Sequence, residues 1–340
     1  MSIVLVNPNL VFQGNDPFTT GIVYMPISLA YFASALLEAG KNIHVIDAFA
    51  ENPAAVSSLV PGSFLVGIDA DEVLRRIIEL KSNIVCVYAI NVLSHISTAE
   101  IIKKVKKHDQ NIKVIVFENT QAVTAYQLSK VSHEFFDIGV DYCFSGEAEI
   151  NGLELINKLE KQDYDSIRTL AGVSSIEFKN EPAPKNKELD ALPFPAWHLF
   201  PLENYWSIKF GHGPFYGHKY LPLLTSRGCP YSCAYCVVPG VNNRKWRFRS
   251  AVNVVDEIEY FVKPVNVQDV GNAFSGPSAQ NARKQAAAVG TGKVISFMAA
   301  ASGDGRLDGG LEREAGGGGV AGVGEGGVGD VAHLAHLHAG

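Results

Sequence analysis

The chain has 340 residues, of which 47% are apolar and 19% charged, and its formal net charge is −6 at pH 7. This composition is typical of a globular protein of about two domains. The acidic balance and the absence of a Lys/Arg-rich block argue against a nucleic-acid-binding surface. We expect neither a signal peptide nor a membrane span, and five cysteines without secretory targeting favour a reducing cytoplasm.

Short apolar runs alternate with helix-period segments through residues 1–162. The runs predict strands at 3–6, 43–47, 83–90, 113–117 and 140–144. The intervening segments predict helices at 26–39, 71–80, 98–107, 121–130 and 147–161. This alternation is typical of a doubly wound, Rossmann-like parallel sheet of the α/β class. Ligands on such sheets bind beyond the carboxyl ends of the strands.

The rest of the chain divides into three segments of different character. Residues 163–220 include three prolines and five aromatic residues at 191–206, which favour an ordered connector packed against both neighbouring domains over a flexible linker. Residues 221–270 restart the pattern with a strand at 221–226, a helix at 252–262 and a strand at 266–270. Residues 271–340 predict a low-complexity, disordered tail, since 301–340 hold fourteen glycines and no aromatic residue. This tail is similar to translation in a shifted reading frame or to a fused foreign segment.

Three cysteines stand close together in the stretch TSRGCPYSCAYCVVP. Cys229, Cys233 and Cys236 have the spacing C-x3-C-x2-C. A structural zinc site needs four ligands, so His212 or His218 would have to complete one. Three thiols can also hold three irons of a four-iron cluster and leave the fourth iron open to substrate or cofactor. The spacing favours this cluster over zinc and over three unrelated buried thiols.

The residues CPYSCAYC resemble the signature of radical SAM enzymes. The resemblance implies that the three cysteines bind a [4Fe–4S] cluster and that Tyr235 lies near the adenine of S-adenosylmethionine. It also implies reductive cleavage of S-adenosylmethionine to methionine and a 5′-deoxyadenosyl radical. The nearby stretch WRFRS also looks like this family. Arg247 and Arg249 can be interpreted as residues of this family motif. The alternative interpretation is that they lie on a solvated face or form a salt bridge at a helix start.

The order of segments resembles cobalamin-binding-domain radical SAM proteins over roughly residues 1–270. In that arrangement an α/β domain and a Pro/aromatic connector precede a partial TIM-type barrel that carries the cluster. The resemblance implies a small-molecule substrate, an electron donor such as flavodoxin or ferredoxin, and cobalamin lying flat over the strand ends. The residues expected beside cobalamin are Asn7, Asn9, Asn91, His95, Glu118, Gln121 and Gly146.

Methyl transfer to an unactivated carbon is the leading reaction that this resemblance implies. Two alternatives stay open: a radical cyclase or rearrangement enzyme, and a non-catalytic remnant that binds cobalamin or a cluster. The remnant is an alternative because 104 residues follow Cys236, too few to complete a barrel. We therefore expect a radical SAM barrel that is incomplete here.

The chain departs from the family's pattern at several positions. It lacks the D-x-H-x-x-G motif that supplies a cobalt-binding histidine, and Val252 replaces the Glu of the R-x-R-S-x-E stretch. Methylthiotransferases, which carry three further cluster cysteines, match less well, because only Cys86 and Cys143 precede the motif. Both lie in apolar runs and are expected to be buried thiols. Asp256 and Glu257 are expected to begin a helix and to serve its dipole.

Overall fold

The computed structural model describes residues 1–14, 23–120, 127–208, 219–234, 236–265 and 269–272. By its contacts the chain divides into the units Met1–Ala299 and Ala300–Gly340. The second unit lies outside the described residues. The same is true of the tail predicted for 271–340, except for Gly271 and Asn272. Within the described part, no helix combines the length and the apolar character that crossing a membrane requires.

A six-stranded sheet forms the centre of the N-terminal half. Its strands are β1 (Ser2–Asn7), β3 (Asn42–Asp47), β6 (Ile84–Ala89), β7 (Lys113–Glu118), β8 (Tyr142–Phe144) and β9 (Val173–Ser174). They follow the order β3-β1-β6-β7-β8-β9; β9 is antiparallel to β8 and every other pair is parallel. The prediction of a parallel-dominated α/β sheet is confirmed. The strand order reverses between β1 and β6, which creates the crevice where such sheets bind ligands.

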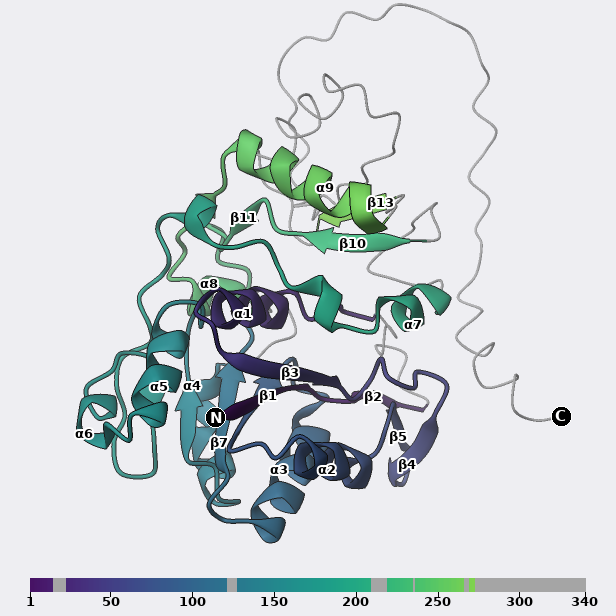
Figure 1. Ribbon diagram of the computed structural model, residues 1–340, viewed down its shortest axis with the longest axis vertical. Helices are drawn as coiled ribbons and strands as arrows, with labels where there is room; N and C mark the ends of the chain where they lie inside the picture. The colour runs from purple at the N-terminus through teal and green to yellow at the C-terminus, as the bar shows by residue number, and fades with distance from the viewer. Residues whose placement is uncertain (15–22, 121–126, 209–218, 235, 266–268, 273–340) are drawn as a thin grey trace, which may run out of the picture. The chain divides into compact units, whose positions relative to one another are not determined.

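Helices cover both faces of this sheet, because alternate side chains of each strand point to opposite faces. Ile3 and Leu5 of β1 pack into one core, and Val4 and Val6 pack into the other. The first core includes α1 (Ile27–Glu38) and α5 (Asn151–Glu160). The second includes α2 (Ala70–Glu79), α3 (His95–His108) and α4 (Leu128–Phe136). Figure 1 shows α1 on one side of β1 and β3, with α2 and α3 on the other.

Three helix starts differ from the sequence prediction, and the differences matter for the site. Helix α5 begins at Asn151, so residues 145–150 form a loop after β8. Helix α3 begins at His95, which makes His95 a helical residue. Helix α4 begins at Leu128, while residues 121–126 of the helix predicted there lie outside the described residues. The first difference leaves a longer stretch of polar chain at the carboxyl end of β8.

A three-stranded antiparallel sheet was not predicted. It consists of β2 (Leu10–Gln13), β5 (Ser63–Val66) and β4 (Val56–Val60), in that order. A tight turn at Pro61 and Gly62 joins β4 to β5, and Gly62 has φ +83°. A Pro-Gly pair between two short apolar runs is the sequence signal that could have revealed this hairpin.

Where the structure describes it, at 163–208 and 219–220, the connector is ordered, as its prolines and aromatic residues predict. It contains α6 (Tyr164–Ile167), two 3-10 turns at Leu189–Ala191 and Trp197–Leu199, and α7 (Leu202–Ser207). Tyr205 is fully buried and its hydroxyl donates to Asp47 Oδ2 at 2.7 Å. Phe194 packs on Tyr260 of the following segment, with 5.6 Å between ring centroids. The connector therefore contacts both the N-terminal sheet and the segment that follows it.

The segment after the connector holds one β–α–β unit. Strand β10 (Tyr220–Leu223) pairs in parallel with β13 (Asp269–Asn272), and α9 (Ala251–Val265) lies between them in the chain. The predicted strands and helix are present, with the second strand displaced from 266–270. A short antiparallel pair, β11 (Ser226–Arg227) with β12 (Arg247–Phe248), interrupts the crossover, and α8 (Val238–Val241) lies inside it. A right-handed β–α–β unit is the repeating element of parallel barrels.

Candidate functional site

The three clustered cysteines lie on a loop that is closed at its base. We call residues 228–246 the cysteine loop; β11 leads into it and β12 leads out. At the neck Arg227 pairs with Arg247, and Ser226 with Phe248. Gly228 has φ +83°, and a Cβ there would stand 2.0 Å from the Lys245 carbonyl oxygen. Only glycine fits this crossing of the two chain segments, so the first residue of the loop is fixed by its backbone.

The cysteine thiols of the loop are accessible, in contrast to the other two in the chain. Cys229 and Cys236 are half-buried and Cys233 is exposed, whereas Cys86 and Cys143 are buried. Burial raises the pKa of Cys236, the hydrogen bond from the Val238 N–H lowers it in part, and the charges of Cys229 and Cys233 raise it further. Among the described residues, no three His, Cys, Asp or Glu side chains are grouped in metal-binding geometry. The structure brings the thiols onto one loop without arranging them as ligands.

The chemistry of this donor set fits an iron–sulfur cluster. Thiolates are the usual ligands of such clusters, and the loop offers three that solvent can reach. Burial raises the pKa values of Cys86 and Cys143 and thus disfavours their thiolates, which confirms their prediction as buried core thiols. Tyr235, expected near the adenine, and His212 and His218, which would complete a zinc site, lie outside the described residues.

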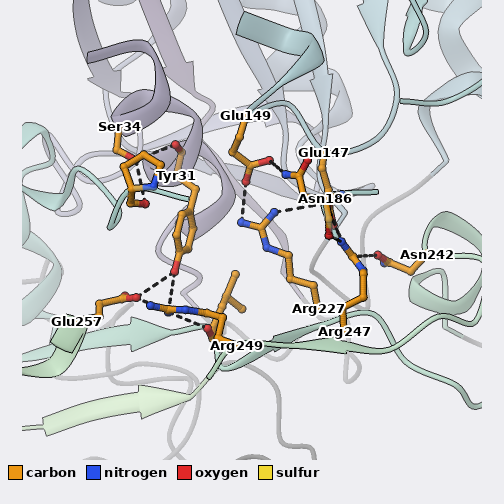
Figure 2. A network of polar contacts seen from close by, with 12 residues as sticks. Tyr31, Ser34, Glu147, Glu149, Asn186, Arg227, Asn242, Arg247, Arg249 and Glu257 are labelled. Carbon is orange, nitrogen blue, oxygen red and sulfur yellow. Dashed lines mark hydrogen bonds and ion pairs between the residues drawn. The ribbon is translucent and has the colours of Figure 1, made fainter. Parts of the chain in front are cut away.

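Buried ion pairs fasten both sides of the neck to the loop after β8. Arg227 Nη2 lies 2.7 Å from Glu149 Oε1, and Arg227 Nη1 lies 3.8 Å from Glu147 Oε2. Arg247 forms a fork on Glu147, with Nη2–Oε1 at 2.5 Å and Nη1–Oε2 at 2.9 Å. Figure 2 shows the two guanidinium groups converging on the two carboxylates, with Asn186 beside them. Sequence analysis missed Arg227, Glu147, Glu149 and Asn186.

The electrostatics of this cluster favour ionised partners. Burial by itself would raise the pKa of Glu147, but the hydrogen bond from Arg247 and the charges of Arg227 and Arg247 hold that pKa below its usual value. The Arg227 guanidinium also lies over the Tyr31 ring, 4.9 Å from its centroid. Contacts with carboxylates and an aromatic face offset the free-energy cost of removing the guanidinium charge from water.

The second arginine of the WRFRS stretch is paired within its own segment and with α1. The Arg249 guanidinium contacts the Glu257 carboxylate, and it also donates to Tyr31 Oη and the Leu224 carbonyl at 3.1 Å each. The expectation that Asp256 and Glu257 begin a helix was wrong, because α9 starts at Ala251; both residues lie in its second turn, where Asp256 is exposed and Glu257 is buried. Burial raises the pKa of Glu257. Arg247 and Arg249 thus both form ion pairs, as one of their two interpretations proposed.

Glu118 connects the end of β7 to the start of α4 and to the loop after β8. Its Oε1 accepts from the Leu128 N–H at 2.9 Å and its Oε2 from the Gly146 N–H at 2.8 Å. Burial raises the pKa of this carboxyl, which the two backbone donors partly oppose. Asn242 of the cysteine loop donates from Nδ2 to the Thr120 carbonyl at 3.0 Å. The cysteine loop therefore meets the carboxyl ends of β7 and β8.

The asparagines expected beside cobalamin lie at the predicted edge, and each also makes internal bonds. Asn7 Nδ2 donates to Asp47 Oδ1 at 2.9 Å, and burial raises the pKa of Asp47. Asn9 Nδ2 donates to the Ile68 carbonyl at 2.5 Å, and Asn91 Oδ1 accepts from the Ser94 N–H at 2.9 Å. Within the described part of the chain, Asn7 Oδ1 is buried without a hydrogen-bond partner. A ligand that donates a hydrogen bond would suit that atom.

His95 is directed toward α4. Its Nε2 lies 3.3 Å from Glu134 Oε2, and its ring packs on Phe135 with 4.8 Å between centroids. The residues beside it are apolar and exposed: Val92, Leu93 and Ile96 are 58%, 39% and 50% exposed. Exposed apolar surface at a strand end suits the flat face of a macrocycle. The roles of His95 and of the other edge residues remain predictions, and Gln121 lies outside the described residues.

A small cavity lies beneath the same edge. Its volume is about 20 Å³, and Phe32, Tyr88, Phe117, Glu118 and Gly146 are among the residues that line it. A cavity of this size holds about one water molecule. A ligand as large as cobalamin would lie over the edge of the sheet, outside this cavity.

Comparison with known proteins identifies relatives by sequence, although no protein-family model matches the chain. It is 26% identical over 307 residues to the cytidylyl-2-hydroxyethylphosphonate methyltransferase of Streptomyces wedmorensis, covering 78% of this chain and 54% of that one. It is 26% identical over 207 residues to an uncharacterised methyltransferase of Pyrococcus horikoshii, covering 50% and 42%. The chain thus spans about half the length, or less, of the curated relatives that it matches.

Two further comparisons concern a cyclase and a solved structure. The chain is 29% identical over 151 residues to the anaerobic magnesium-protoporphyrin IX monomethyl ester cyclase of a Synechocystis species, covering 42% of this chain and 27% of that one. The structure of the radical S-adenosylmethionine methyltransferase TsrM from Kitasatospora setae, bound to tryptophan and a SAM analogue, superposes with a TM-score of 0.56. It is 19% identical and covers 85% of this chain and 50% of that one, so it shows a shared fold.

The relatives confirm the resemblance found in the sequence. Two sequence relatives are methyltransferases by name, and the structural neighbour is a radical S-adenosylmethionine methyltransferase. The chain is therefore similar in sequence to methyltransferases, and it shares its fold with a radical S-adenosylmethionine methyltransferase.

Proposed function

We propose that the chain carries out cobalamin-dependent radical SAM chemistry, with methyl transfer to an unactivated carbon of a small molecule as its leading reaction. One observation carries the proposal: the loop with Cys229, Cys233 and Cys236 meets the ligand-binding edge of a parallel sheet. The contact is made by Arg227 and Arg247 on Glu147 and Glu149, and by Asn242 on Thr120. The methyltransferase relatives support the same chemistry.

Each part of the chain has an assigned role in this proposal. The three cysteines would hold the [4Fe–4S] cluster and Tyr235 would lie against the adenine of S-adenosylmethionine. The carboxyl ends of β1, β6, β7 and β8 would receive cobalamin, with apolar support from Val92, Leu93 and Ile96. When bound, these groups supply an electron, a 5′-deoxyadenosyl radical from S-adenosylmethionine, and a transferable methyl group. The buried arginine–carboxylate contacts keep the loop and the edge together.

The proposal also assigns domains and partners. Residues 1–162 are the cobalamin-binding domain, 163–220 the connector, and 221–270 the start of an incomplete radical SAM barrel. The described residues of the last segment supply one β–α–β unit. We propose a small-molecule substrate, a flavodoxin- or ferredoxin-type electron donor and a cytoplasmic location.

A second candidate is radical cyclisation or rearrangement with the same cofactors. The identity to the cyclase over 151 residues favours it. A third candidate is a non-catalytic remnant that binds cobalamin or the cluster; it is favoured because the described residues after 220 supply one β–α–β unit. The three candidates share the cofactor sites and differ in the products that form.

Anaerobic reconstitution separates these candidates. The full chain, loaded with iron, sulfide and cobalamin, is incubated with S-adenosylmethionine and a chemical reductant, and its products are separated by chromatography. We expect both 5′-deoxyadenosine and S-adenosylhomocysteine, the latter from transfer of the S-adenosylmethionine methyl group. 5′-Deoxyadenosine alone would support cyclisation or rearrangement. A cobalamin absorbance spectrum without cleavage would overturn the enzymatic proposal and support the remnant.

The control replaces all three loop cysteines by alanine. This variant should retain the fold and lose formation of 5′-deoxyadenosine, because the thiolates are the expected cluster ligands. Equal product from this variant would show that the cleavage does not come from the cysteine loop.

A further inference from the structure

Four buried charged residues join the cysteine loop to the sheet, and we call Glu147, Glu149, Arg227 and Arg247 the clamp. The arginines are cross-strand partners in the β11–β12 pair, one on each side of the loop's neck. Both carboxylates belong to residues 145–150, the loop that follows β8. The clamp thus holds both ends of the cysteine loop against one short segment (Figure 2).

The clamp is withdrawn from water. The Arg227 and Arg247 side chains are 4% and 13% exposed, and those of Glu147 and Glu149 are 0% and 3% exposed. Salt screens such pairs little, and removing one partner leaves an uncompensated buried charge. The charge of Glu147 also acts on Lys185, whose pKa is lowered by burial.

The carboxylates are oriented by donors from the connector, and the loop that carries them is held by Glu118 of β7. The Asn186 N–H donates to Glu147 Oε2 at 2.9 Å, and Asn186 Nδ2 donates to Glu149 Oε2 at 3.1 Å. The Gly146 N–H, next to Glu147, donates to Glu118 at 2.8 Å. Arg247 Nη1 also donates to the Asn186 carbonyl at 2.6 Å, so the asparagine belongs to the same network. Backbone and amide donors thus help to orient Glu147 and Glu149 for contact with the two guanidinium groups.

The clamp residues lie close in sequence to both proposed cofactor sites. Arg227 stands two residues before Cys229. Because the backbone at Gly228 between them is closely packed, a movement of Arg227 should also move Cys229. On the other side, Gly146 is one of the residues expected beside cobalamin. A shift of the clamp would move the cluster ligands relative to the sheet edge.

We propose that Glu147, Glu149, Arg227 and Arg247 are positioning residues that set the place of the cluster relative to cobalamin. This inference rests on the proposed function, since it requires both cofactors. The residues act through the cysteine loop and need not touch either cofactor. Their loss should change the separation of the two cofactors before it changes the binding of either.

Electron paramagnetic resonance tests this placement in the full chain loaded with both cofactors. The probe is the spin–spin coupling between the reduced cluster and cob(II)alamin, compared between wild type and the double variant Glu147→Gln with Glu149→Gln. We expect both cofactors at wild-type occupancy and a weaker or broader coupling in the variant. An unchanged coupling at full occupancy would overturn the proposal.

The control variant is Asp141→Asn. Asp141 pairs with Lys106, with 2.6 Å between Lys106 Nζ and Asp141 Oδ2; it precedes β8, whereas the clamp carboxylates follow the other end of that strand. Its loss should lower stability and leave the coupling unchanged. A change of coupling in Asp141→Asn equal to that in the double variant would assign the effect to general destabilisation and overturn the proposal.

Amide hydrogen exchange covers the cases in which the double variant does not fold or wild type binds no cofactor. Arg247→Lys keeps the charge but loses the fork on Glu147, and exchange in residues 228–246 should rise about tenfold or more. If exchange in residues 228–246 does not rise above that of Asp141→Asn, the proposal that the clamp holds the loop is overturned. A wild type that binds neither cofactor contradicts the proposed function, whereas the exchange result decides whether the clamp holds the loop.

Discussion

The N-terminal sheet and the cysteine loop use the same residue type in opposite ways. Cys86 and Cys143 lie inside strands, are 0% exposed, and are surrounded by aliphatic and aromatic side chains of the two cores. The three loop cysteines are partly or fully open to solvent on a segment with little regular structure. Strand periodicity buries a thiol as a small apolar group, whereas a loop presents it to a ligand.

The two regions also differ in how their backbone is held. The sheet is held by ladders of parallel hydrogen bonds and two apolar cores. The cysteine loop is held by one tight crossing at Gly228 and by a few buried polar contacts, chiefly the clamp. The loop should therefore be sensitive to single substitutions that the sheet would tolerate, and the following predictions test that difference.

Gly228→Ala should have the largest effect. An added Cβ would meet the Lys245 carbonyl oxygen at 2.0 Å in a backbone conformation with φ +83°. We expect a loss of about 3 kcal/mol or more in the free energy of unfolding and failure to incorporate iron. Chemical denaturation and iron analysis measure the two effects.

Gly62→Ala is the matched control for that substitution. Gly62 has the same φ of +83°, and a Cβ there would meet nothing within 4 Å. The strain alone should cost about 1–2 kcal/mol and leave iron incorporation at the wild-type level. Equal losses for the two glycines would show that the crossing at the neck is unimportant.

Glu147→Gln should have an intermediate effect that depends on pH. The native pKa of Glu147 is held below the usual carboxyl value of 4.5, so its ionised form stabilises the fold at all pH values above about 4.5. This stabilisation is lost as the pH falls from about 4.5 through the native pKa. The variant should be about 2 kcal/mol less stable at neutral pH, and the difference should shrink in acid.

Denaturation of both proteins at pH 7, 5 and 3.5 measures this difference. The comparison with the variant removes the contributions of Asp47, Glu118 and Glu257, whose pKa values burial raises and whose effect has the opposite sign. A difference that grows as the pH falls below 4.5 would contradict the assigned role of Glu147.

Cys143→Ser should have the smallest effect and should leave the cysteine loop intact. The substitution puts a hydroxyl in place of a fully buried thiol in β8, at a cost of about 1–2 kcal/mol. Iron incorporation should stay at the wild-type level. Loss of iron without loss of stability would contradict the separation between core and ligand cysteines.

Much of the N-terminal half could be predicted from sequence because its signals are local. Continuous apolar runs such as 83–90 mark strands buried on both faces, and β6 is found there. The hairpin β4–β5 was missed because its strands are short and partly exposed, as Val56 and Val60 show at 53% and 43%. Strands of five and four residues are too short to show a clear period, so the Pro-Gly turn between them was the available signal.

The site was predictable where its signal is a motif and was missed where it depends on distant partners. The spacing of the cysteines identified the loop, and the family order located the sheet edge. The pairing of Arg227 with Glu149 joins residues far apart in the chain, so no local pattern reveals it. The sequence offered one indication of these ion pairs. Two acidic residues, Glu147 and Glu149, follow a predicted strand, and the basic Arg227 precedes the first cysteine.

The central claim is that the cysteine loop holds a four-iron cluster, and iron and acid-labile sulfide content test it most directly. Wild type, the variant with alanine at 229, 233 and 236, and the variant with alanine at 86 and 143 are each reconstituted without oxygen. Wild type and the 86/143 variant should bind about four irons and four sulfides per chain, and the triple loop variant almost none. Iron and sulfide that persist in the loop variant, or that are absent from wild type, would contradict the account.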